Sequence, residues 1–527
     1  MERTVKMELL QFDELNCKNC YKCVRHCPVK AIEVKNHRAQ IRADECILCG
    51  ECTIVCPQKT KEPVSEMTEL QEALKDGKKI IASVAPSFFA YYGVPFDAFR
   101  EGLMKLGFSD VFETAEGAYL VKSQYEDLIA NTQNQVWISS CCSSVNLLIT
   151  KYHTEVLKNL APVLTPIQAH ARLLKERFPD AMIAFVTPCI SKKAERYEAD
   201  SQLDFSVSFE EMQAMLDQEK IQLDNAPDEE ERKYLSRSFP MDGGIVATMA
   251  KAEGYHYVSV SGYEACVQAI RDIQKGKIKS CFVEMSLCEG SCIGGPIFRK
   301  RQQSLLGGSL EVQKYANVSD YSEDFNIQDV PVMQKTFSSV HRVIHLPPSE
   351  EQLVATLHKM GKYSQKDELN CGMCGYPSCR EKAAAILEGK AEINMCLPFM
   401  HERAESFSNQ ILEITPDAIL SVDSDLKIQQ INQAACDIFR VTSGDVLYQP
   451  VSRVLDEFSF VDIMMNGTPK VEKTAFLADY HVYLNQTFLY DKESGRVVCI
   501  MKNISADRQK RNVSMKKKVQ AAAMADE

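Results

Sequence analysis

Long apolar runs are missing from this sequence, and two kinds of segment are excluded with them. Residues 1–12 lack the apolar core of a signal peptide, and no later stretch approaches the uninterrupted run that a membrane span needs. The glycine-rich phosphate loops GxGxxG and GxxxxGK(S/T) are also absent. We therefore expect a cytoplasmic protein with no membrane partner, and use of NAD or another nucleotide only through a partner subunit.

An excess of positive charge is missing too. The 527 residues carry a formal net charge of −11, and this balance argues against nucleic acid as a main partner. One basic stretch, residues 508–518, is short enough to be a solvated helix face, and residues 511–527 are expected to form a flexible basic tail. A chain of this length is too long for one core, so we expect three or four domains.

Cysteine, in contrast, is abundant, with 21 residues. In a reducing compartment a disulfide framework is not expected, and metal ligation explains the cysteines better. Sixteen of the 21 fall into groups of four with iron–sulfur spacing. Four others are expected to pack as small hydrophobic residues: Cys266, Cys281, Cys436 and Cys499.

The first two groups form an internal repeat within residues 1–75, because each cysteine of one has a counterpart 29 residues later. The spacing C-x2-C-x2-C-x3-C-P lets three cysteines of one loop bind one [4Fe–4S] cluster while the fourth crosses to the other. Two zinc knuckles are the alternative, but they have no use for the third cysteine or the CP ending. We assign one cluster to Cys17, Cys20, Cys23 and Cys56, and the second to Cys46, Cys49, Cys52 and Cys27, in a ferredoxin-like domain.

Residues 76–350 have the pattern of an α/β domain. Four apolar runs each predict a buried strand that ends at a motif, with amphipathic helical stretches between them. The runs are KKIIASVAPSFF, NQVWISSCC, AMIAFVTPC and KSCFVEMSLC. Parallel sheets place functional loops at the carboxyl ends of their strands. The third cysteine group, which is scattered over three of these motifs, is therefore expected to build an active site.

These three motifs resemble the ones that hold the H-cluster of the [FeFe]-hydrogenases. SSCCS, TPCISKKAE and EMSLCEGSCIGGP stand where the family has TSCCP, MPCxxKxxE and ExMACxxGCxxGGGxP. The resemblance implies four ligands for a [4Fe–4S] cubane: Cys142, Cys189, Cys288 and Cys292. It also implies that Cys292 bridges this cubane to a two-iron subsite carrying CO, cyanide and a bridging dithiolate amine.

The same resemblance assigns roles around the subsite. Cys141 matches the residue that passes protons to the bridging amine, although a lone cysteine is often only a small buried hydrophobe. Lys192, with Glu195 completing KxxE, matches the lysine that hydrogen-bonds one cyanide. The segments that hold the second cyanide and approach the cofactor are matched by Ala85, Pro86, Ser87, Gly243 and Gly244.

Several positions depart from the family pattern. Hydroxyl side chains replace two methionines and a proline: Ser286, Thr187 and Ser143. One glycine of GGG is missing, and the two proton-relay glutamates are replaced by Tyr125 and Leu128, with Glu126 close by. These changes predict a more polar pocket with Ser286 among its catalytic groups, an altered proton path, and slow turnover.

The C-terminal half contains a fourth cysteine group and a different domain. A single [4Fe–4S] domain, with zinc as the alternative, is predicted within residues 351–400 from Cys371, Cys374, Cys379 and Cys396. Residues 401–510 are expected to form a linker helix and a PAS domain. Residues 412–507 resemble a PAS domain, with an opening hairpin, a helix beginning near Asn432 and the closing strand VVCIMKN. His481 is expected on a strand, packed or exposed, and not as a haem ligand.

The predicted fold class is therefore multidomain, α/β and α+β, with a ferredoxin-like domain, a hydrogenase domain, a single [4Fe–4S] domain and a PAS domain. The predicted function is a sensory-type [FeFe]-hydrogenase that cleaves H2 reversibly to two protons and two electrons at an H-cluster. Three accessory [4Fe–4S] clusters would carry the electrons. Expected partners are H2 and protons, a redox partner such as ferredoxin, a downstream signalling protein, and a second copy through the PAS domain.

Two alternatives remain open. A bulk fermentative or respiratory hydrogenase would be expected to keep the methionines, the proline and the relay glutamates. A non-catalytic hydrogenase-like iron–sulfur protein would hold no two-iron subsite, and retention of Cys141, Lys192 and the Cys288-x3-Cys292 pair argues against it.

Overall fold

The computed structural model describes residues 9–510 except 14, 133, 199–200, 224–233, 317–318, 322–332, 340–341, 344–345, 507 and 509. The expected tail, residues 511–527, lies outside the described residues, as does most of the basic stretch 508–518. The chain divides into two compact units, Met1–Cys396 and Leu397–Glu527. No helix in the described part of the chain is long and apolar enough to cross a membrane.

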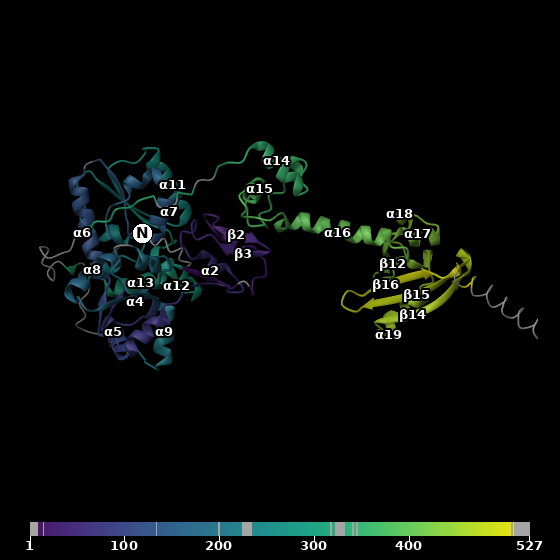
Figure 1. The fold of residues 1–527 in the computed structure, drawn as a ribbon, viewed down its shortest axis with the longest axis horizontal. Helices are drawn as coiled ribbons and strands as arrows, with labels where there is room; N and C mark the ends of the chain where they lie inside the picture. Colours follow the sequence, from purple (N-terminus) through teal and green to yellow (C-terminus); the bar gives the residue numbers. More distant parts are fainter. Residues whose placement is uncertain are drawn as a thin grey trace, which may run out of the picture. The chain divides into compact units, whose positions relative to one another are not determined.

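The N-terminal repeat folds as two halves with matching elements, of which Figure 1 labels β2, β3 and α2. Each half places a short helix at its cysteine loop, α1 (Lys22–His26) in the first and α2 (Glu51–Val55) in the second. Strands β2 (Ile32–Lys35) and β3 (Arg38–Ile41) form one antiparallel hairpin, and β1 (Leu10–Phe12) pairs with β4 (Lys61–Pro63).

Gly50, at the start of α2, shows how closely the repeat packs on the following domain. Its φ of +75° suits glycine, and a Cβ there would lie 2.6 Å from Ile190 Cδ1 and 2.7 Å from Pro296 Cγ. Because Ile190 follows Cys189 and Pro296 follows the last cysteine motif, this contact brings the second cysteine loop against the scattered group.

The central α/β region contains two parallel sheets. The first has the order β6-β5-β8-β9, and the second has the order β10-β11-β7. Their strands are β5 (Ile80–Val84), β6 (Asp110–Glu113), β7 (Val136–Ile138), β8 (Met182–Thr187), β9 (Phe205–Ser208), β10 (His256–Ser261) and β11 (Cys281–Ser286). The four strands predicted to end at motifs are confirmed as β5, β7, β8 and β11. All neighbouring pairs within each sheet are parallel, so the motifs share the carboxyl edges.

Helices connect these strands and bury the sheet faces. They are α3 (Met67–Lys75), α4 (Phe88–Tyr92), α5 (Phe96–Lys105), α6 (Ala115–Asn131), α7 (Ser143–Tyr152), α8 (Pro166–Arg177), α9 (Phe209–Gln218), α10 (Gly244–Thr248), α11 (Tyr263–Gln274), α12 (Pro296–Lys300) and α13 (Leu305–Tyr315). Capping boxes at Thr165 and Ser208 begin α8 and α9, where the predicted helices TPIQAHARLLKERF and FEEMQAMLDQEK lie. Cys266 and Cys281 are buried in the core, as predicted.

The last part of the first unit is the single-cluster segment, residues 350–396. It contains α14 (Glu350–Lys359) and α15 (Cys379–Leu387), and the fourth cysteine, Cys396, ends it. The second unit begins with α16 (Leu397–Ile414), which confirms the predicted linker helix.

The second unit is built on a five-stranded antiparallel sheet with the order β13-β12-β16-β15-β14. Its elements are β12 (Ala418–Val422), β13 (Ile428–Ile431), α17 (Gln433–Phe439), α18 (Ser443–Val446), α19 (Phe458–Asn466), β14 (Lys470–Leu477), β15 (Val482–Asp491) and β16 (Arg496–Asn503). Asn432 caps α17, as predicted, and Cys436 and Cys499 are buried. His481 is exposed, but it lies in a turn before β15 with φ 55°, so its expected place on a strand was wrong.

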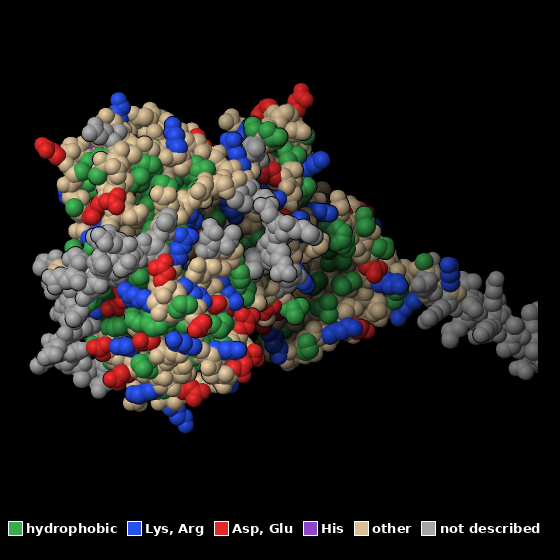
Figure 2. Space-filling view, turned by 60° about the vertical axis from the view of Figure 1, so that its left-hand side comes forward, with side chains coloured by type: hydrophobic (Ala, Val, Ile, Leu, Met, Phe, Trp, Pro, Cys, Tyr) green, Lys and Arg blue, Asp and Glu red, His purple; other side chains and the backbone are tan. Residues whose placement is uncertain are grey.

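Charges of both signs are interspersed on the face shown in Figure 2. One ion pair, however, is buried beneath the α/β surface. Arg237 donates to both carboxylate oxygens of Glu113, at 2.8 and 2.5 Å, and its guanidinium lies 4.9 Å from the ring centre of Phe89. Because Glu113 ends β6 and Arg237 lies three residues before Pro240, the pair fixes two segments of the site described below.

We predict that Arg237→Met destabilises the first unit by about 3–5 kcal/mol, because it leaves Glu113 charged and buried. The double variant Glu113→Gln with Arg237→Met should recover part of this loss. Urea unfolding followed through Trp137, the one tryptophan of the chain and buried in β7, measures both. A change below about 1 kcal/mol, as typical of an exposed pair, would contradict the prediction.

Candidate metal centres and active site

The four scattered cysteines meet at one small cavity. Cys142 follows β7, Cys189 follows β8, and the remaining two lie after β11 in the loop that contains Gly290. A cavity of about 30 Å³ is lined by all four: Cys142, Cys189, Cys288 and Cys292. Cys49 of the N-terminal repeat lines the same cavity. Long-range folding therefore brings these thiols together, which the linear sequence only suggests.

A larger cavity of about 110 Å³ adjoins the first. It shares Cys142, Cys189 and Cys292 with the small cavity, but Cys288 does not line it. Other residues of its wall are Ala85, Pro86, Ser87, Cys141, Thr187, Lys192 and Ser286. Cys292 has accessible surface and lines this space. Three thiols on the wall of both cavities therefore lie where a cubane in the small cavity would meet a group in the larger one.

The residues present fit the two-part cofactor that the motifs imply. Burial raises the pKa of Cys292 to about 12, and neighbouring thiols at Cys189 and Cys142 add to the effect. Such crowded thiols are costly to ionise unless metal offsets their charge. Ser87 Oγ is buried at the larger cavity and has no hydrogen-bond partner among the described residues. A bound polar group would satisfy it.

Lys192 and Glu195 form the charged part of the wall. Lys192 Nζ donates to Cys141 O at 2.8 Å and to Glu195 Oε1 at 2.7 Å. An ammonium has three donors, so one remains for a group in the cavity. Burial alone would lower the pKa of Lys192, but Glu195 raises it. The lysine therefore stays charged and can meet an anion.

Glu195 itself does not line the cavity, but it organises the wall from behind. Its Oε1 accepts a short hydrogen bond from Ser143 Oγ, and its Oε2 accepts one from Thr165 Oγ1 at 2.5 Å. Ser143 stands where the family pattern has proline. The substitution therefore supplies a hydroxyl that helps to hold the carboxylate on Lys192.

The other hydroxyl substitutions form a connected set beside the cysteine ligands. Ser286 Oγ lies 3.0 Å from Ser291 Oγ, which lies 3.1 Å from Cys189 Sγ. Thr187 Oγ1 accepts a hydrogen bond from Cys189 N at 3.2 Å. Hydroxyl groups therefore lie beside Cys189, and a pocket more polar than that of the family stays a prediction.

Cys141 lies in the larger cavity and contacts a tyrosine. Its Sγ is 3.3 Å from Tyr125 OH, which also lies 2.8 Å from Ser140 Oγ. Burial raises the pKa of Cys141 to about 12, although Tyr125 and Lys192 favour its thiolate. Tyr125 occupies one position of the missing relay glutamates. Leu128 packs against the apolar core.

Glu284, the first residue of the motif EMSLCEGSCIGGP, is a buried carboxyl for which the sequence predicted no role. It lies on β11, its Oε2 accepts a hydrogen bond from Val246 N at 2.8 Å, and its Oε1 has no partner among the described residues. Burial raises its pKa to about 7, and its charge would raise the pKa of Cys141. A single acidic residue inside the apolar strand CFVEMS was the signal that could have revealed it.

Glu126 does not reach Cys141 by any contact in the described structure. Its Oε1 accepts a hydrogen bond from Ala250 N at 2.7 Å. Burial lowers the pKa of Lys251, the next residue, while the charges of Glu284 and Glu126 raise it. Charged groups therefore lead from the surface at Glu126 toward the buried Glu284.

The glycine pair predicted near the cofactor lies behind the wall. Gly243 and Gly244 line neither cavity, but they begin α10, whose Ile245 lines the larger one. A Cβ on Gly244 would lie 1.9 Å from Ser238 O. The pair therefore lets the backbone turn tightly. This turn brings Val246 N within hydrogen-bond distance of Glu284 Oε2.

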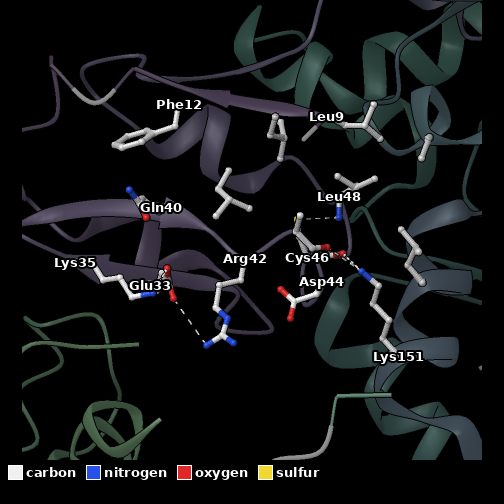
Figure 3. Close-up of a pocket in the computed structure, with 15 residues that line it drawn as sticks. Leu9, Phe12, Glu33, Lys35, Gln40, Arg42, Asp44, Cys46, Leu48 and Lys151 are labelled. Carbon is white, nitrogen blue, oxygen red and sulfur yellow. Dashed lines mark hydrogen bonds and ion pairs between the residues drawn. The ribbon is translucent and has the colours of Figure 1, made fainter. Parts of the chain in front are cut away.

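The N-terminal cysteines surround two further sites beside the active site. Their thiols accept local backbone hydrogen bonds, including Leu48 N to Cys46 Sγ at 3.3 Å and Ala31 N to Cys27 Sγ at 3.3 Å. Figure 3 shows Cys46 at a pocket of about 560 Å³, with Lys151 donating to Cys46 O at 2.7 Å. The cubane predicted from Cys27, Cys46, Cys49 and Cys52 is called proximal below, and the one predicted from Cys17, Cys20, Cys23 and Cys56 is called distal.

The donor geometry differs from that of a mononuclear site. Among the residues that the structure describes, no three Cys, His, Asp or Glu side chains converge on a single metal ion. The thiolates of a cubane bind separate irons and need not converge so closely. In the single-cluster segment, Cys396 is buried and Cys371 is exposed.

Three family models match parts of the chain. Residues 78–296 match the iron only hydrogenase large subunit, C-terminal domain, and residues 9–72 match a 4Fe-4S dicluster domain. Residues 367–398 match a model of an Fe-S cluster segment. The chain is thus an [FeFe]-hydrogenase-like iron–sulfur protein.

Individual relatives are distant or match short stretches. NADP-reducing hydrogenase subunit HndD of Solidesulfovibrio fructosivorans is 21% identical over 351 residues, which is 53% of this chain and 59% of the relative. A subunit of the ion-translocating oxidoreductase complex of Methanosarcina acetivorans is 43% identical over 49 residues, 9% of this chain and 19% of the relative. The chain therefore spans less than two thirds of these curated relatives.

Solved structures align with separate parts. A variant of [FeFe]-hydrogenase HydA1 from Chlamydomonas reinhardtii has a TM-score of 0.40 and 16% identity, covering 52% of this chain and 99% of its own. The PAS domain of an HTR-like protein from Haloarcula marismortui has a TM-score of 0.17 and 21% identity, covering 20% of this chain and 95% of its own.

We predict that Cys288→Ala lowers the iron content by about four atoms per chain or more, because it opens the active-site cubane. Cys281→Ala is the matched control, since this buried thiol lies on the same strand-and-loop segment but lines neither cavity. Iron and sulfide analysis of anaerobically matured protein measures both. Equal iron in the two variants would show that Cys288 is not a ligand.

Proposed function

We propose that this protein is a sensory-type [FeFe]-hydrogenase that interconverts H2 with two protons and two electrons slowly. The observation that carries the proposal is the pair of adjoining cavities that share Cys142, Cys189 and Cys292. Cys288 lies only on the small one, where a cubane would sit, whereas Cys141 and Lys192 lie only on the larger one. This division matches a two-part cofactor.

The bound H-cluster would supply the open iron and the basic amine at which H2 is split. Residues of this chain would hold and serve it. Lys192 offers its third donor to an anionic ligand, and Ser87 Oγ can donate to another. Apolar residues such as Ile167 and Phe185 line the cavity and limit the entry of water.

Protons would pass through Cys141 and then along the charged groups behind it. Glu284 can take up and release a proton near neutral pH, and Lys251 with Glu126 leads onward to the surface. Tyr125, in contrast, is a poor relay, because burial raises its pKa well above the usual value. A path that needs Glu284 in place of a glutamate directly beside Cys141 is expected to be slow.

The sensory assignment depends on the second unit. Its five-stranded antiparallel sheet and its helices fit the PAS-like pattern of the sequence. We propose that it reports the redox or ligand state of the active site to a signalling partner, and that it mediates a homodimer. A ferredoxin-like protein would exchange electrons with the accessory clusters. A bulk hydrogenase is the second candidate.

Infrared spectroscopy of matured protein tests the H-cluster directly. We expect bands from iron-bound CO and cyanide, because both cavities and the lysine are in place. Their absence in protein that carries its full complement of cubanes would overturn the proposal and favour the non-catalytic alternative.

We predict that Cys141→Ala lowers H2 turnover by about 10²-fold or more, because the cavity then has no proton donor beside the subsite. Iron content and the infrared bands should persist, since Cys141 is not a cluster ligand. Cys281→Ala, which removes a buried thiol elsewhere, should keep its activity. Undiminished turnover in Cys141→Ala would show that protons enter by another route.

Glu284→Gln should also slow turnover, by about 10²-fold, and flatten its pH dependence around pH 7, because an amide cannot exchange the proton. Glu289→Gln, an exposed carboxyl on the neighbouring loop, is the control.

Since Glu284 is neutral in the folded chain and ionised in the unfolded chain between pH 4.5 and about 7, its contribution to stability falls as pH rises through this range. In Glu284→Gln, the stability of the folded chain should fall less over this pH range than in the wild type. A wild-type pH profile would remove Glu284 from the path.

For the sensory role we predict a change in hydrogen exchange across residues 412–506 when H2 replaces N2 over the full-length protein. Cys141→Ala, which should retain its clusters but turn over poorly, serves as the comparison. Identical protection of this region under both gases, together with turnover as fast as that of bulk enzymes, would favour the bulk hydrogenase.

A further inference from the structure

The cysteine loop of the single-cluster segment is held by the N-terminal repeat. Arg25 Nη2 donates to Met373 O at 2.9 Å, and Arg25 Nε donates to Gly372 O at 3.3 Å. Lys30 Nζ donates to Gly375 O at 3.0 Å and also to Val24 O and Arg25 O, both at 3.0 Å. Two cationic side chains of the repeat therefore hydrogen-bond to backbone carbonyls on both sides of Cys374.

Close packing supports these hydrogen bonds. Gly375 has a φ of +95°, and a Cβ there would lie 2.8 Å from Val24 Cγ1 and 3.1 Å from Arg25 N. Only glycine allows the loop this close to α1. Tyr376 and Met395 share one buried core with Val24 and Ile32. The contact is thus a packed interface and not a surface salt bridge.

A second set of contacts fixes the orientation of the segment. Val34 N donates to Lys390 O at 2.8 Å, and Asn36 N donates to Glu392 Oε1 at 2.7 Å. Lys390 Nζ also forms a buried ion pair with Glu45 at 2.7 Å. In Figure 1, α15 accordingly lies beside β2 and β3.

The position of this interface relative to the cubanes is informative. Lys30 lies near Cys27 and Cys374, since its backbone N donates to Cys27 O at 3.3 Å and its Nζ donates to Gly375 O, next to Cys374. Burial lowers the pKa of Lys30, while both thiols raise it. Cys27 belongs to the proximal cubane, whose Cys49 lines the small active-site cavity. The proximal cubane therefore has the active site on one side and the single cluster on another, while the distal cubane shares the repeat with it.

We propose that the proximal cubane is an electron branch point, from which one route leads to the distal cubane and a second leads through the contact of residues 24–30 with 372–376 to the single cluster. This proposal rests on the proposed function, because the electrons come from H2. Each H2 yields two protons and two electrons, and each transfer oxidises one cubane and reduces its neighbour by one electron. Since α16 begins directly after Cys396, the second route ends at the linker of the sensory unit.

Lys30 has an electrostatic part in this route. A positive charge between two clusters stabilises the reduced, more negative state of each, and local charge is one of the factors that set cluster potentials. Arg25 acts by positioning the loop. Lys30 would therefore act on the branch to the single cluster, because it contacts the loop of that cluster.

Electron paramagnetic resonance tests the branch without the two-iron subsite. Full-length protein loaded only with [4Fe–4S] clusters would be titrated with a reductant at fixed potentials. We expect the signal of the single cluster to broaden and relax faster once the proximal cubane is also reduced. In protein with complete iron content, a spectrum equal to the sum of the separate cluster signals would show no spin coupling and would overturn the proposal. This test needs no variant.

Variants then locate the route. Lys30→Met should shift the midpoint potential of the single cluster to a more negative value, and Arg25→Met with Lys30→Met should weaken the spin coupling. Lys35→Met is the matched control, because this exposed lysine of the same repeat pairs with Glu33. Potentials that move equally in Lys30→Met and Lys35→Met would refute the role of Lys30.

The outcome is separable from that of the proposed function. Missing CO and cyanide bands would remove the H2 chemistry but leave the spin coupling unaffected. Normal bands with no coupling would keep the hydrogenase and remove the branch.

Discussion

The structure depends on one constraint: thiols from loops far apart in sequence must reach the same small volume. Cys142 and Cys189 lie 47 positions apart in the sequence and come from different sheets. Parallel strands meet this requirement because their carboxyl ends share an edge, and each sheet contributes motifs to that edge. The fold around the cavities, including the buried pair of Arg237 and Glu113, keeps these edges in place.

The charges near the cofactor follow from this arrangement. Lys192 would be unstable alone in a buried wall, so Glu195 holds it, and Ser143 and Thr165 hold Glu195. The carboxylate is fully occupied by these partners, and the lysine keeps one donor. A charge balanced in this way can accept an anionic ligand without moving, which is the preorganisation that a cofactor site requires.

Much of this could be predicted from sequence because cysteine spacing and strand patterns are local signals. The strands β5, β7, β8 and β11 were predicted from apolar runs that end at motifs. Glu284 belongs to a matched motif, but its role could not be predicted, because one acidic residue in an apolar strand has no local signature of its partners. The contact of Tyr125 with Cys141 also escaped prediction, since sequence alignment shows a replaced residue but not where its hydroxyl lies.

The location of the single-cluster segment is the clearest case of information that sequence order conceals. The segment follows the hydrogenase-like region in the chain, so its neighbours in sequence suggest direct contact with the active site. Instead Arg25 and Lys30, more than 340 positions away, bind its loop. A hydrogen bond to a backbone carbonyl leaves no pattern in the acceptor's sequence, because every residue has one. Gly375 is the exception, since its positive φ and the nearby Val24 exclude a side chain. Gly375 therefore reflects docking on α1 as well as the turn of the cysteine loop, and the proposed path from active site to sensory unit runs back through the N-terminal repeat.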